Sequence, residues 1–235
     1  MMNVFRLTLI CLISISGAWS AAPKSYNQAK PYVYALFREH PITLYCHCRY
    51  EHKKINLNSC NMQSAAHLAR AHRVELEHMM PAENFGRQLA CWREKICIKN
   101  NKAYRGRKCC RQQSPLFNQA EGELYNLWPS VGLVNGARSN FRYNAFKGSA
   151  FYGCPIVIDK THRQVSPADE VKGIVARANL FMSDKYHIVL SSAQRRLFLA
   201  WHEQFPPDVW EKQWAAAVKE IEGYANPYIQ TSTRF

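Results

Sequence analysis

Alternating apolar and polar residues mark three short segments of the chain. They are residues 41–50 (PITLYCHCRY), 72–81 (HRVELEHMMP) and 151–159 (FYGCPIVID). In the second segment the alternation places three apolar residues on one face, namely Val74, Leu76 and Met80. A period of two is typical of a strand with one buried face. The pattern therefore predicts a strand in each segment.

Apolar residues three or four positions apart predict helices in two further segments. One covers Glu83 to about Cys97, and the other covers residues 115–128 (PLFNQAEGELYNLW). Pro129 should end the second helix, because proline lacks the N–H group that a helix interior needs. The dipeptide Asn135-Gly136 indicates a turn.

The C-terminal third carries clearer helix signals. Capping residues predict three helix starts, at Ser166-Pro167, at Ser191 or Ser192, and at Asp208. Apolar residues recur at helical spacing in the first helix (Val171, Ile174, Val175, Ala178, Phe181) and in the third (Trp210, Trp214, Val218, Ile221). An apolar stripe of this kind faces a core, so we expect these helices to pack as scaffold.

The organisation of the chain points to a single domain. It contains no repeats, no low-complexity tract and no linker rich in Pro, Gly or Ser. We expect residues 21–235 to form one mixed α+β domain with a helical C-terminal third, which is long enough to bury a large core.

The first twenty residues have the pattern of a secretory signal peptide. Arg6 precedes the apolar run from Leu7 to Ile15, and Ala18-Trp19-Ser20 offers small residues at a cleavage site. Such a segment is too short to span a bilayer. We expect residues 1–20 to be a signal peptide cleaved near Ser20, and the mature protein to be periplasmic or secreted. No later stretch approaches about 18 consecutive apolar residues, so we expect no membrane association of the mature form.

The cysteine content indicates disulfide bonds. Of nine cysteines, Cys11 leaves with the signal peptide. The remaining eight form an even set in an exported chain: Cys46, Cys48, Cys60, Cys91, Cys97, Cys109, Cys110 and Cys154. A zinc site is less well supported, because Cys46-His47-Cys48 and the vicinal Cys109-Cys110 are poor tetrahedral chelates. Eight cysteines allow about a hundred connectivities, so the sequence leaves their pairing open.

The chain is strongly basic. Its formal net charge is +14 at pH 7, with one dense basic stretch at Arg105, Arg107, Lys108 and Arg111. Such an excess attracts polyanions, whether nucleic acid, an anionic membrane or an acidic polysaccharide. A solvated basic surface would give the same charge, so charge alone does not identify the function.

Several polar residues lie outside the core pattern. Glu77 and His78 are neighbours at the end of the second predicted strand. Adjacent strand residues face opposite sides of a sheet, so the two can flank one scissile phosphate only if the backbone bends toward Pro81. Arg107 in the basic stretch and Asn126 in the segment before Pro129 also need explaining.

Several motifs resemble the bacterial endonuclease I family of periplasmic and secreted nucleases. The resemblance rests on VELEHMMPAENFGRQLACWRE (74–94), GRKCC (106–110) and LYNLWPSVGLVNGARSNFRY (124–143), and it extends to NPYI (226–229). Its specificity comes from the combination of E-H-x-x-P-A with N-L-x-P-S-V-G-x-V-N-G. It covers essentially the whole mature chain.

This resemblance implies a ββα-metal, or His-Me finger, nuclease that cuts DNA, and often RNA, with little sequence preference. It implies that His78 is the general base and that Glu77 and Asn126 are ligands of the metal. It also implies that Arg107 holds the cleaved phosphate. Five further residues are weaker candidates for contact with the substrate: Arg105, Lys108, Asn135, Arg138 and Asn140.

The chemistry of phosphodiester hydrolysis suits these residue types. A neutral imidazole with a pKa of about 6.5 can accept a proton from water. A hard cation, Mg²⁺ first and Ca²⁺ or Mn²⁺ otherwise, prefers oxygen ligands such as a carboxylate and an amide. A guanidinium group donates forked hydrogen bonds to phosphate. Together with the resemblance, this chemistry leads us to expect an enzyme with one divalent cation that acts on DNA and, as the resemblance implies, on RNA. We also expect it to be a monomer.

Two other functions remain open. A basic, disulfide-linked nucleic-acid-binding or adhesion protein without catalysis would also explain the charge and the export. An exported zinc hydrolase would need three ligands, and the chain has no HExxH motif. A chelator separates these functions, because a metal-dependent nuclease stops cutting in EDTA whereas a binding protein still binds DNA.

Overall fold

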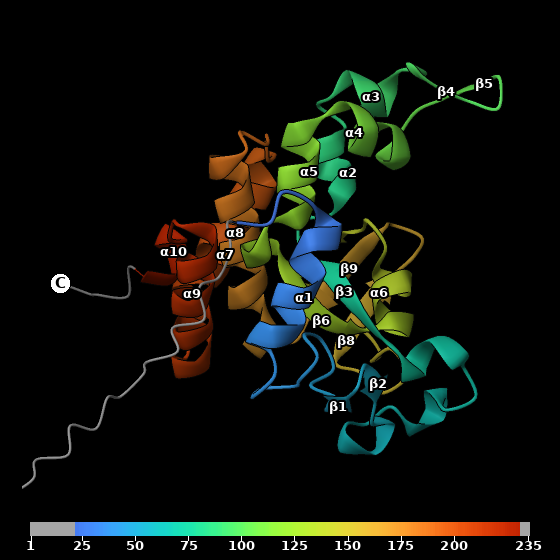
Figure 1. Ribbon diagram of the computed structural model, residues 1–235. Helices are drawn as coiled ribbons and strands as arrows, with labels where there is room; N and C mark the ends of the chain where they lie inside the picture. The colour runs from blue at the N-terminus through green and yellow to red at the C-terminus, as the bar shows by residue number, and fades with distance from the viewer. Residues whose placement is uncertain (1–21, 231–235) are drawn as a thin grey trace, which may run out of the picture.

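Two strands that lie far apart in the sequence pair near the middle of the molecule (Figure 1). They are β3 (Val74–His78) and β6 (Leu127–Val131), and their antiparallel register sets His78 opposite Leu127. The structure is a computed structural model that describes residues 22–230. The predicted signal peptide and its cleavage site lie outside these residues.

Helix α6 (Gly132–Arg138) follows β6 without a loop and packs back against β3, which makes a continuous strand–strand–helix unit. Gly132 permits this tight start. A Cβ there would lie only 2.9 Å from the carbonyl oxygen of Arg70, too close for any other residue without a shift of the backbone. The unit places the end of β3 beside the side chains of α6.

The remaining elements surround this unit. Helices α1 (Tyr26–Leu36), α2 (Ala82–Gly86), α3 (Ala90–Arg93), α4 (Arg107–Gln113) and α5 (Pro115–Gly122) precede β6, with 3₁₀ turns η1 (Leu57–Ser59), η2 (Gln63–Ala65), η3 (Ala69–His72) and η4 (Leu124–Asn126). Strands β7 (Arg142–Tyr143), β9 (Gln164–Pro167) and β8 (Ile156–Asp159) form a sheet in that order. Two hairpins complete the strands, β1 (Tyr50–Glu51) with β2 (Lys54–Ile55), and β4 (Cys97–Lys99) with β5 (Lys102–Tyr104).

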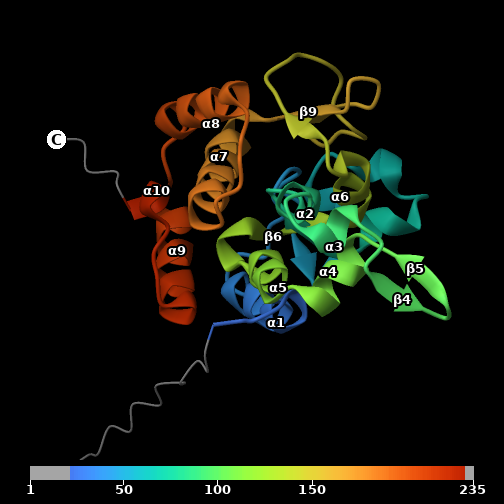
Figure 2. The same cartoon turned by 90° about the horizontal axis from the view of Figure 1, so that it is seen from above.

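The predicted helical C-terminal third is confirmed. Helices α7 (Asp169–Lys185), α8 (Ser192–Gln204), α9 (Val209–Glu222) and α10 (Pro227–Gln230) gather on one side of the molecule (Figure 2). The side chains of Ser191 and Asp208 cap α8 and α9 as expected. The first of the three helices begins at Asp169 and not at Ser166, because Ser166 and Pro167 belong to β9.

Aromatic side chains join these helices to the central strands. Trp128 of β6 packs against Trp214 of α9, with ring centroids 4.9 Å apart, and against Phe37 at 4.8 Å. The face of α9 expected to be apolar buries Trp214, Val218 and Ile221. The mixed α+β core is therefore shared by the central strand pair and the C-terminal helices. Within residues 22–230, no helix is both long and apolar enough to cross a membrane.

All eight cysteines of the mature chain are paired, as predicted. The pairs are Cys46–Cys154, Cys48–Cys60, Cys91–Cys110 and Cys97–Cys109. The first bridge joins residues 108 positions apart, whereas the last closes a loop of only 12 positions.

The predicted strand over residues 41–50 is wrong for most of its length. The segment contains a turn in which His47 N–H donates to the carbonyl oxygen of Thr43, and His47 has a positive φ of 52°. Disulfides from Cys46 and Cys48 fix both sides of this turn. Only the isolated bridge between Ile42 and Arg49, and the short strand β1, retain strand pairing.

Two predicted helices are shorter than the pattern indicated. Residues 83–97 form α2 and α3 with a break at Gly86, where a Cβ would overlap the Trp92 ring. The helix predicted over residues 115–128 ends at Gly122, since the next residue, Glu123, leaves the helical conformation with a ψ of 115°. The next residues turn and enter β6.

Three other local predictions also need correction. Pro129 does not follow a helix but lies within β6 opposite Leu76. Asn135-Gly136 lies inside α6 and is not a turn. Of the strand predicted over residues 151–159, only Ile156–Asp159 is regular. In each case pairing or packing with a distant segment overrides the local signal.

The lengths of the loops that the disulfides close generate a stability prediction. Replacing both members of a pair by alanine should lower the free energy of unfolding by about 2–5 kcal/mol. Removing Cys46–Cys154 should cost about 1–2 kcal/mol more than removing Cys97–Cys109, because the longer loop constrains the unfolded chain more. Urea unfolding of the two double variants measures the difference. Equal losses, or a larger loss for Cys97–Cys109, would contradict this ranking.

Candidate active site

A pocket of about 680 Å³ opens where β3 ends. Helices α1, α2, α4 and α6 contribute to its walls together with Trp92 of α3. Among the sequence candidates it brings together Glu77, His78 and Arg107. It also brings in three weaker candidates, Asn135, Arg138 and Asn140.

The imidazole of His78 is held in one tautomer. Its Nε2 lies 2.9 Å from the carbonyl oxygen of Glu121, and because a carbonyl only accepts, Nε2 carries the hydrogen. Nδ1 is then the acceptor atom, and it has no hydrogen bond within residues 22–230. The Tyr26 ring packs beside the imidazole at 5.1 Å. Burial, together with the positive charge of Arg107, lowers the pKa of His78 to about 4, so the ring is neutral at neutral pH.

Glu121 organises the other wall of the pocket. Its buried carboxylate accepts hydrogen bonds from Arg107 and from Arg111, whose Nε lies 2.6 Å from Oε2. Burial would raise the pKa of Glu121, but the hydrogen bonds and charges of the two arginines outweigh it and hold the pKa below its ordinary value. Two guanidinium groups against one carboxylate leave excess positive charge on this wall. Both arginines remain partly exposed.

Glu77 lies at the bottom of the pocket and is 1% exposed. Its Oε1 accepts a hydrogen bond of 2.7 Å from the Tyr45 hydroxyl and lies 3.1 Å from Nη1 of Arg138. Burial raises the pKa of Glu77, and the guanidinium of Arg138 opposes that rise. Both contacts use the same carboxylate oxygen, which leaves Oε2 available to a ligand.

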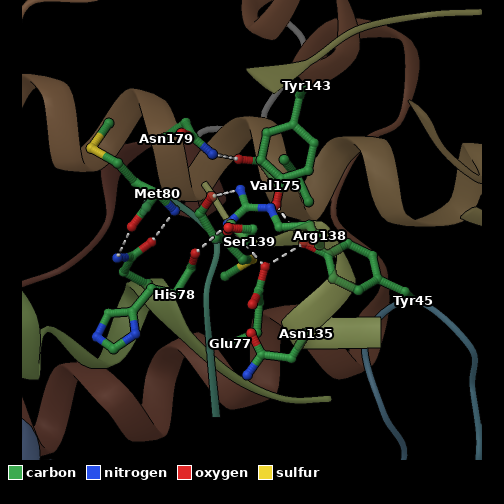
Figure 3. A network of polar contacts seen from close by, with 12 residues as sticks. Tyr45, Glu77, His78, Met80, Asn135, Arg138, Ser139, Tyr143, Val175 and Asn179 are labelled. Atoms are coloured by element: carbon green, nitrogen blue, oxygen red, sulfur yellow. Dashed lines mark hydrogen bonds and ion pairs between the residues drawn. The ribbon is translucent and has the colours of Figure 1, made fainter. Parts of the chain in front are cut away.

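Asn135 projects from α6 next to this carboxylate (Figure 3). Its amide nitrogen donates to Oε2 of Glu75 at 3.2 Å, which fixes the orientation of the amide. The amide oxygen has no hydrogen bond in the part of the chain that the structure describes. Two oxygen atoms of the kind that hard cations prefer, from Glu77 and Asn135, are thus both left without donors.

The structure does not bring Asn126 to the pocket. Its side chain is fully buried, and both of its polar atoms bond to the backbone of Met80. Oδ1 accepts from Met80 N at 2.6 Å, and Nδ2 donates to Met80 O at 3.0 Å. No atom of Asn126 is left to bind a metal, so its role here is to hold the segment after β3.

Arg138 also differs from its expected role as a contact of the substrate. It is 1% exposed, and its guanidinium donates to the carbonyl oxygens of His78 and Met79 at 3.1 and 2.7 Å. All these partners are internal (Figure 3). Arg138 therefore borders the pocket as a buried support of Glu77 and His78, with its donors directed to groups inside the protein.

The remaining sequence candidates lie at or beyond the rim of the pocket. Asn140 lines it, but its Oδ1 accepts a hydrogen bond from Arg163 at 2.7 Å. Arg105 donates to the carbonyl oxygen of Arg93, and Arg105 and Lys108 are both outside the pocket wall. Arg107 alone of the three basic candidates faces His78.

Three residues of the site are not among the sequence candidates, although Arg111 belongs to the basic stretch. Arg111 follows Arg107 by one helical turn, and that spacing was the available signal. Glu121 is an acidic residue of an amphipathic helix, which would ordinarily be exposed, yet it is buried. Tyr45 lies in residues 41–50, for which the sequence pattern predicts a strand. Their roles depend on contacts with residues distant in the chain.

Comparison with known proteins gives a consistent picture. The family model described as Endonuclease I matches residues 16–233. The chain is 38% identical to an extracellular deoxyribonuclease of Aeromonas hydrophila over 88% of this chain and 89% of that protein. It is 36% identical to a periplasmic deoxyribonuclease of the same organism, over 88% and 86% of the two chains. It is 35% identical to Endonuclease-1 of Buchnera aphidicola subsp. Baizongia pistaciae, over 97% and 93%.

The contacts of Asn126 generate a prediction about stability. Asn126→Ala leaves the buried N–H and C=O of Met80 without partners, and each such group costs about 1–3 kcal/mol. Chemical unfolding should show a correspondingly lower free energy of unfolding for the variant. Asn118→Ala is the matched control, because Asn118 donates a single hydrogen bond at a more exposed site and its loss should cost less than about 1 kcal/mol. An Asn126 variant as stable as the control would contradict the scaffold role.

Proposed function

The chain belongs to the endonuclease I family, and from this membership and the geometry of the pocket we propose that it is an exported, metal-dependent endonuclease. The proposed reaction is hydrolysis of phosphodiester bonds in DNA, and in RNA, without sequence preference. The observation that carries the proposal is the placement of one neutral imidazole beside two free oxygen ligands and two guanidinium groups.

His78 acts as the general base. The Glu121 carbonyl holds its Nε2–H, so Nδ1 is the atom that accepts a proton from the attacking water. The low pKa of His78 keeps this atom unprotonated over the neutral range. Glu121 thereby sets the orientation of the base without taking part in proton transfer.

Glu77 and Asn135 hold the cation, and Asn135 replaces Asn126 in this role. The available oxygens, one carboxylate and one amide, suit a hard ion such as Mg²⁺ better than a thiolate-preferring or imidazole-preferring metal. Within residues 22–230 no cluster of three or more His, Cys, Asp or Glu is present that could hold a metal by itself. The site therefore fits a cation that shares its coordination with phosphate oxygens and water. When bound, the cation would stabilise negative charge on the phosphate and on the leaving oxygen.

Strands β3 and β6 with helix α6 correspond in this proposal to the ββα-metal motif. The order of the elements supports the assignment, because β3 ends in Glu77 and His78 and α6 supplies Asn135. The chain after His78 leads through Pro81 into α2, and Pro81, Ala82 and Glu83 line the pocket beside His78.

Arg107 and Arg111 bind the phosphate being cleaved. Both reach the pocket from α4 and are oriented by Glu121, so they present guanidinium donors without further ordering. Groups aimed at phosphate act alike on the two nucleic acids, because phosphate contacts carry no base information. This is the basis for including RNA and for expecting little sequence preference.

Separate observations support export and a monomeric state. Four disulfides are typical of proteins in oxidising compartments. Two of the relatives named above are an extracellular and a periplasmic deoxyribonuclease. The pocket is complete within one chain, which supports a monomer as the active form.

The test of the function uses His78→Ala on plasmid DNA and on RNA, with Mg²⁺ and with EDTA. Removing a general base should lower the cleavage rate by about 10²–10⁴-fold while leaving DNA binding nearly intact. EDTA should stop the native enzyme. His72→Ala is the matched control, because His72 is exposed, bonds to the Ala66 carbonyl and lies outside the pocket. Binding without any cleavage by the native protein would instead support a nucleic-acid-binding protein without catalysis.

A second test separates the two asparagines. Asn135→Ala should raise the Mg²⁺ concentration needed for half-maximal cleavage, since one of few protein ligands is lost, and calorimetry should show weaker Mg²⁺ binding. Stability should change little. Asn140→Ala serves as control, because its amide oxygen is already bonded to Arg163. Unchanged Mg²⁺ affinity in the Asn135 variant would remove Asn135 from the metal site.

A further inference from the structure

A narrow two-stranded ribbon projects from the molecule and belongs neither to the core nor to the pocket. It consists of β4 and β5 with their flanks, residues 95–105, and we call it the β4–β5 ribbon (Figure 1). Cys97 pairs with Tyr104 and Lys99 with Lys102, and the turn between the strands is Asn100-Asn101. Both asparagines have positive φ, 49° and 58°, which is the conformation of a tight two-residue hairpin turn.

Disulfides hold the base of this ribbon. An isolated two-stranded hairpin is marginally stable in water, because it has no third strand or helix to pack against. Here Cys97–Cys109 joins β4 to α4, and Cys91–Cys110 joins α3 to the next residue of α4. The hydroxyl of Tyr104 also donates to Gln112 at 2.6 Å. The ribbon is therefore built to keep one direction although residues 98–103 are all exposed.

The ribbon carries positive charge and no acid of its own. Lys95, Lys99 and Lys102 are exposed, and none of them has an ion pair among the described residues. Glu94, just before it, is the only acidic residue in the stretch 94–111. Free lysine side chains at this density attract a polyanion.

One face of the ribbon is apolar and uncovered. Cys97 and Tyr104 face α4, so Ile98 and Ala103, which pair with each other, face the opposite side. Ile98 is 76% exposed. Lys99 and Lys102 pair with each other at the tip, on the face opposite Ile98, where their long exposed side chains can extend past the edges of the narrow ribbon. Such a ribbon fits the major groove of duplex DNA, which admits two strands and has phosphates on both sides.

The position of the ribbon connects it to the active site. It leaves the protein between α3 and α4, the helices whose Trp92 and Arg107 line the pocket. It points away from the side of the molecule that holds α9 (Figure 2). DNA that enters the pocket past Arg107 and continues in this direction runs along the ribbon.

From these observations we propose that the β4–β5 ribbon is a DNA-binding arm that seats in a groove of duplex DNA beyond the cleavage site. Lys99 and Lys102 contact phosphates, and Ile98 contacts the sugar and base edges in the groove. At about 3.4 Å per residue the strands reach roughly 10–14 Å, the length of about three or four base pairs. The arm thus makes the enzyme favour longer duplexes. This inference rests on the proposed nuclease function for the direction of the DNA.

The experiment measures DNA binding separately from cleavage. The Lys99→Ala/Lys102→Ala variant of the mature chain is compared with Lys212→Ala/Lys219→Ala, a matched pair of exposed lysines on α9. Binding to a duplex of about 30 base pairs and to a hairpin with a stem of about six is followed in EDTA over a range of salt concentrations. Thermal melting checks that both variants keep the stability of the native protein.

The arm variant should bind the long duplex roughly 10–30-fold more weakly at about 0.15 M salt, and its salt slope should be flatter by about 1.8, which is two phosphate contacts at about 0.9 each. Its affinity for the short hairpin and its cleavage rate at saturating long duplex should match those of the native protein. Ile98→Ser should weaken binding of the long duplex only. An arm variant that behaves like the α9 control, or an Ile98→Ser variant with native affinity, would overturn the proposal.

The outcomes also separate this inference from the proposed function. A native protein that binds long duplex through the arm but cuts nothing with Mg²⁺ would contradict the nuclease function and leave the arm supported. A native protein that cuts DNA, with no change in the arm variant, would contradict the arm alone.

Discussion

The buried guanidinium of Arg138 connects helix α6 to the end of strand β3. Arg138, at the end of α6, lies 3.1 Å from the carboxylate of Glu77 and donates to the carbonyl oxygens of His78 and Met79. An unpaired charge in this position would cost several kcal/mol, so the three partners must stay where they are for the chain to fold. Asn135 lies one helical turn before Arg138 on the same helix. The contact that anchors α6 to β3 therefore also places the Asn135 amide beside Glu77.

Glu121 likewise positions His78, Arg107 and Arg111. Its backbone carbonyl sets the tautomer of His78, and its carboxylate holds Arg107 and Arg111 in the pocket. The Arg138 guanidinium thus supports Glu77 and places α6, and the Glu121 carboxylate supports the two arginines. Tyr45 completes the support of Glu77, and the Cys46–Cys154 bridge fixes the segment that carries it. Geometry at the pocket consequently depends on contacts that span most of the chain.

The sequence predicts those parts of the fold that local patterns determine. The alternation in β3 and the caps at Ser191 and Asp208 belong to single elements, so both were predicted correctly. The same sequence supports a family assignment and identifies Glu77 and His78 as neighbours of interest. It does not distinguish Asn126 from Asn135. Asn126 comes just before β6 and Asn135 follows it, and only the pairing of β6 with β3 decides which amide faces Glu77. Tertiary packing likewise decides which residues fit within a helix, since a Cβ at Gly122 would lie 2.7 Å from the backbone of Ser25.

The central claim is that Glu77 and Asn135 hold one divalent cation beside His78. Anomalous scattering from crystals soaked in Mn²⁺ tests this claim most directly, because it locates the metal independently of any activity. The account predicts one strong peak within coordination distance of a Glu77 carboxylate oxygen and the Asn135 amide oxygen, on the pocket side of the His78 ring. A peak bound to Asn126, or ordered metal sites only on the outer surface, would contradict it.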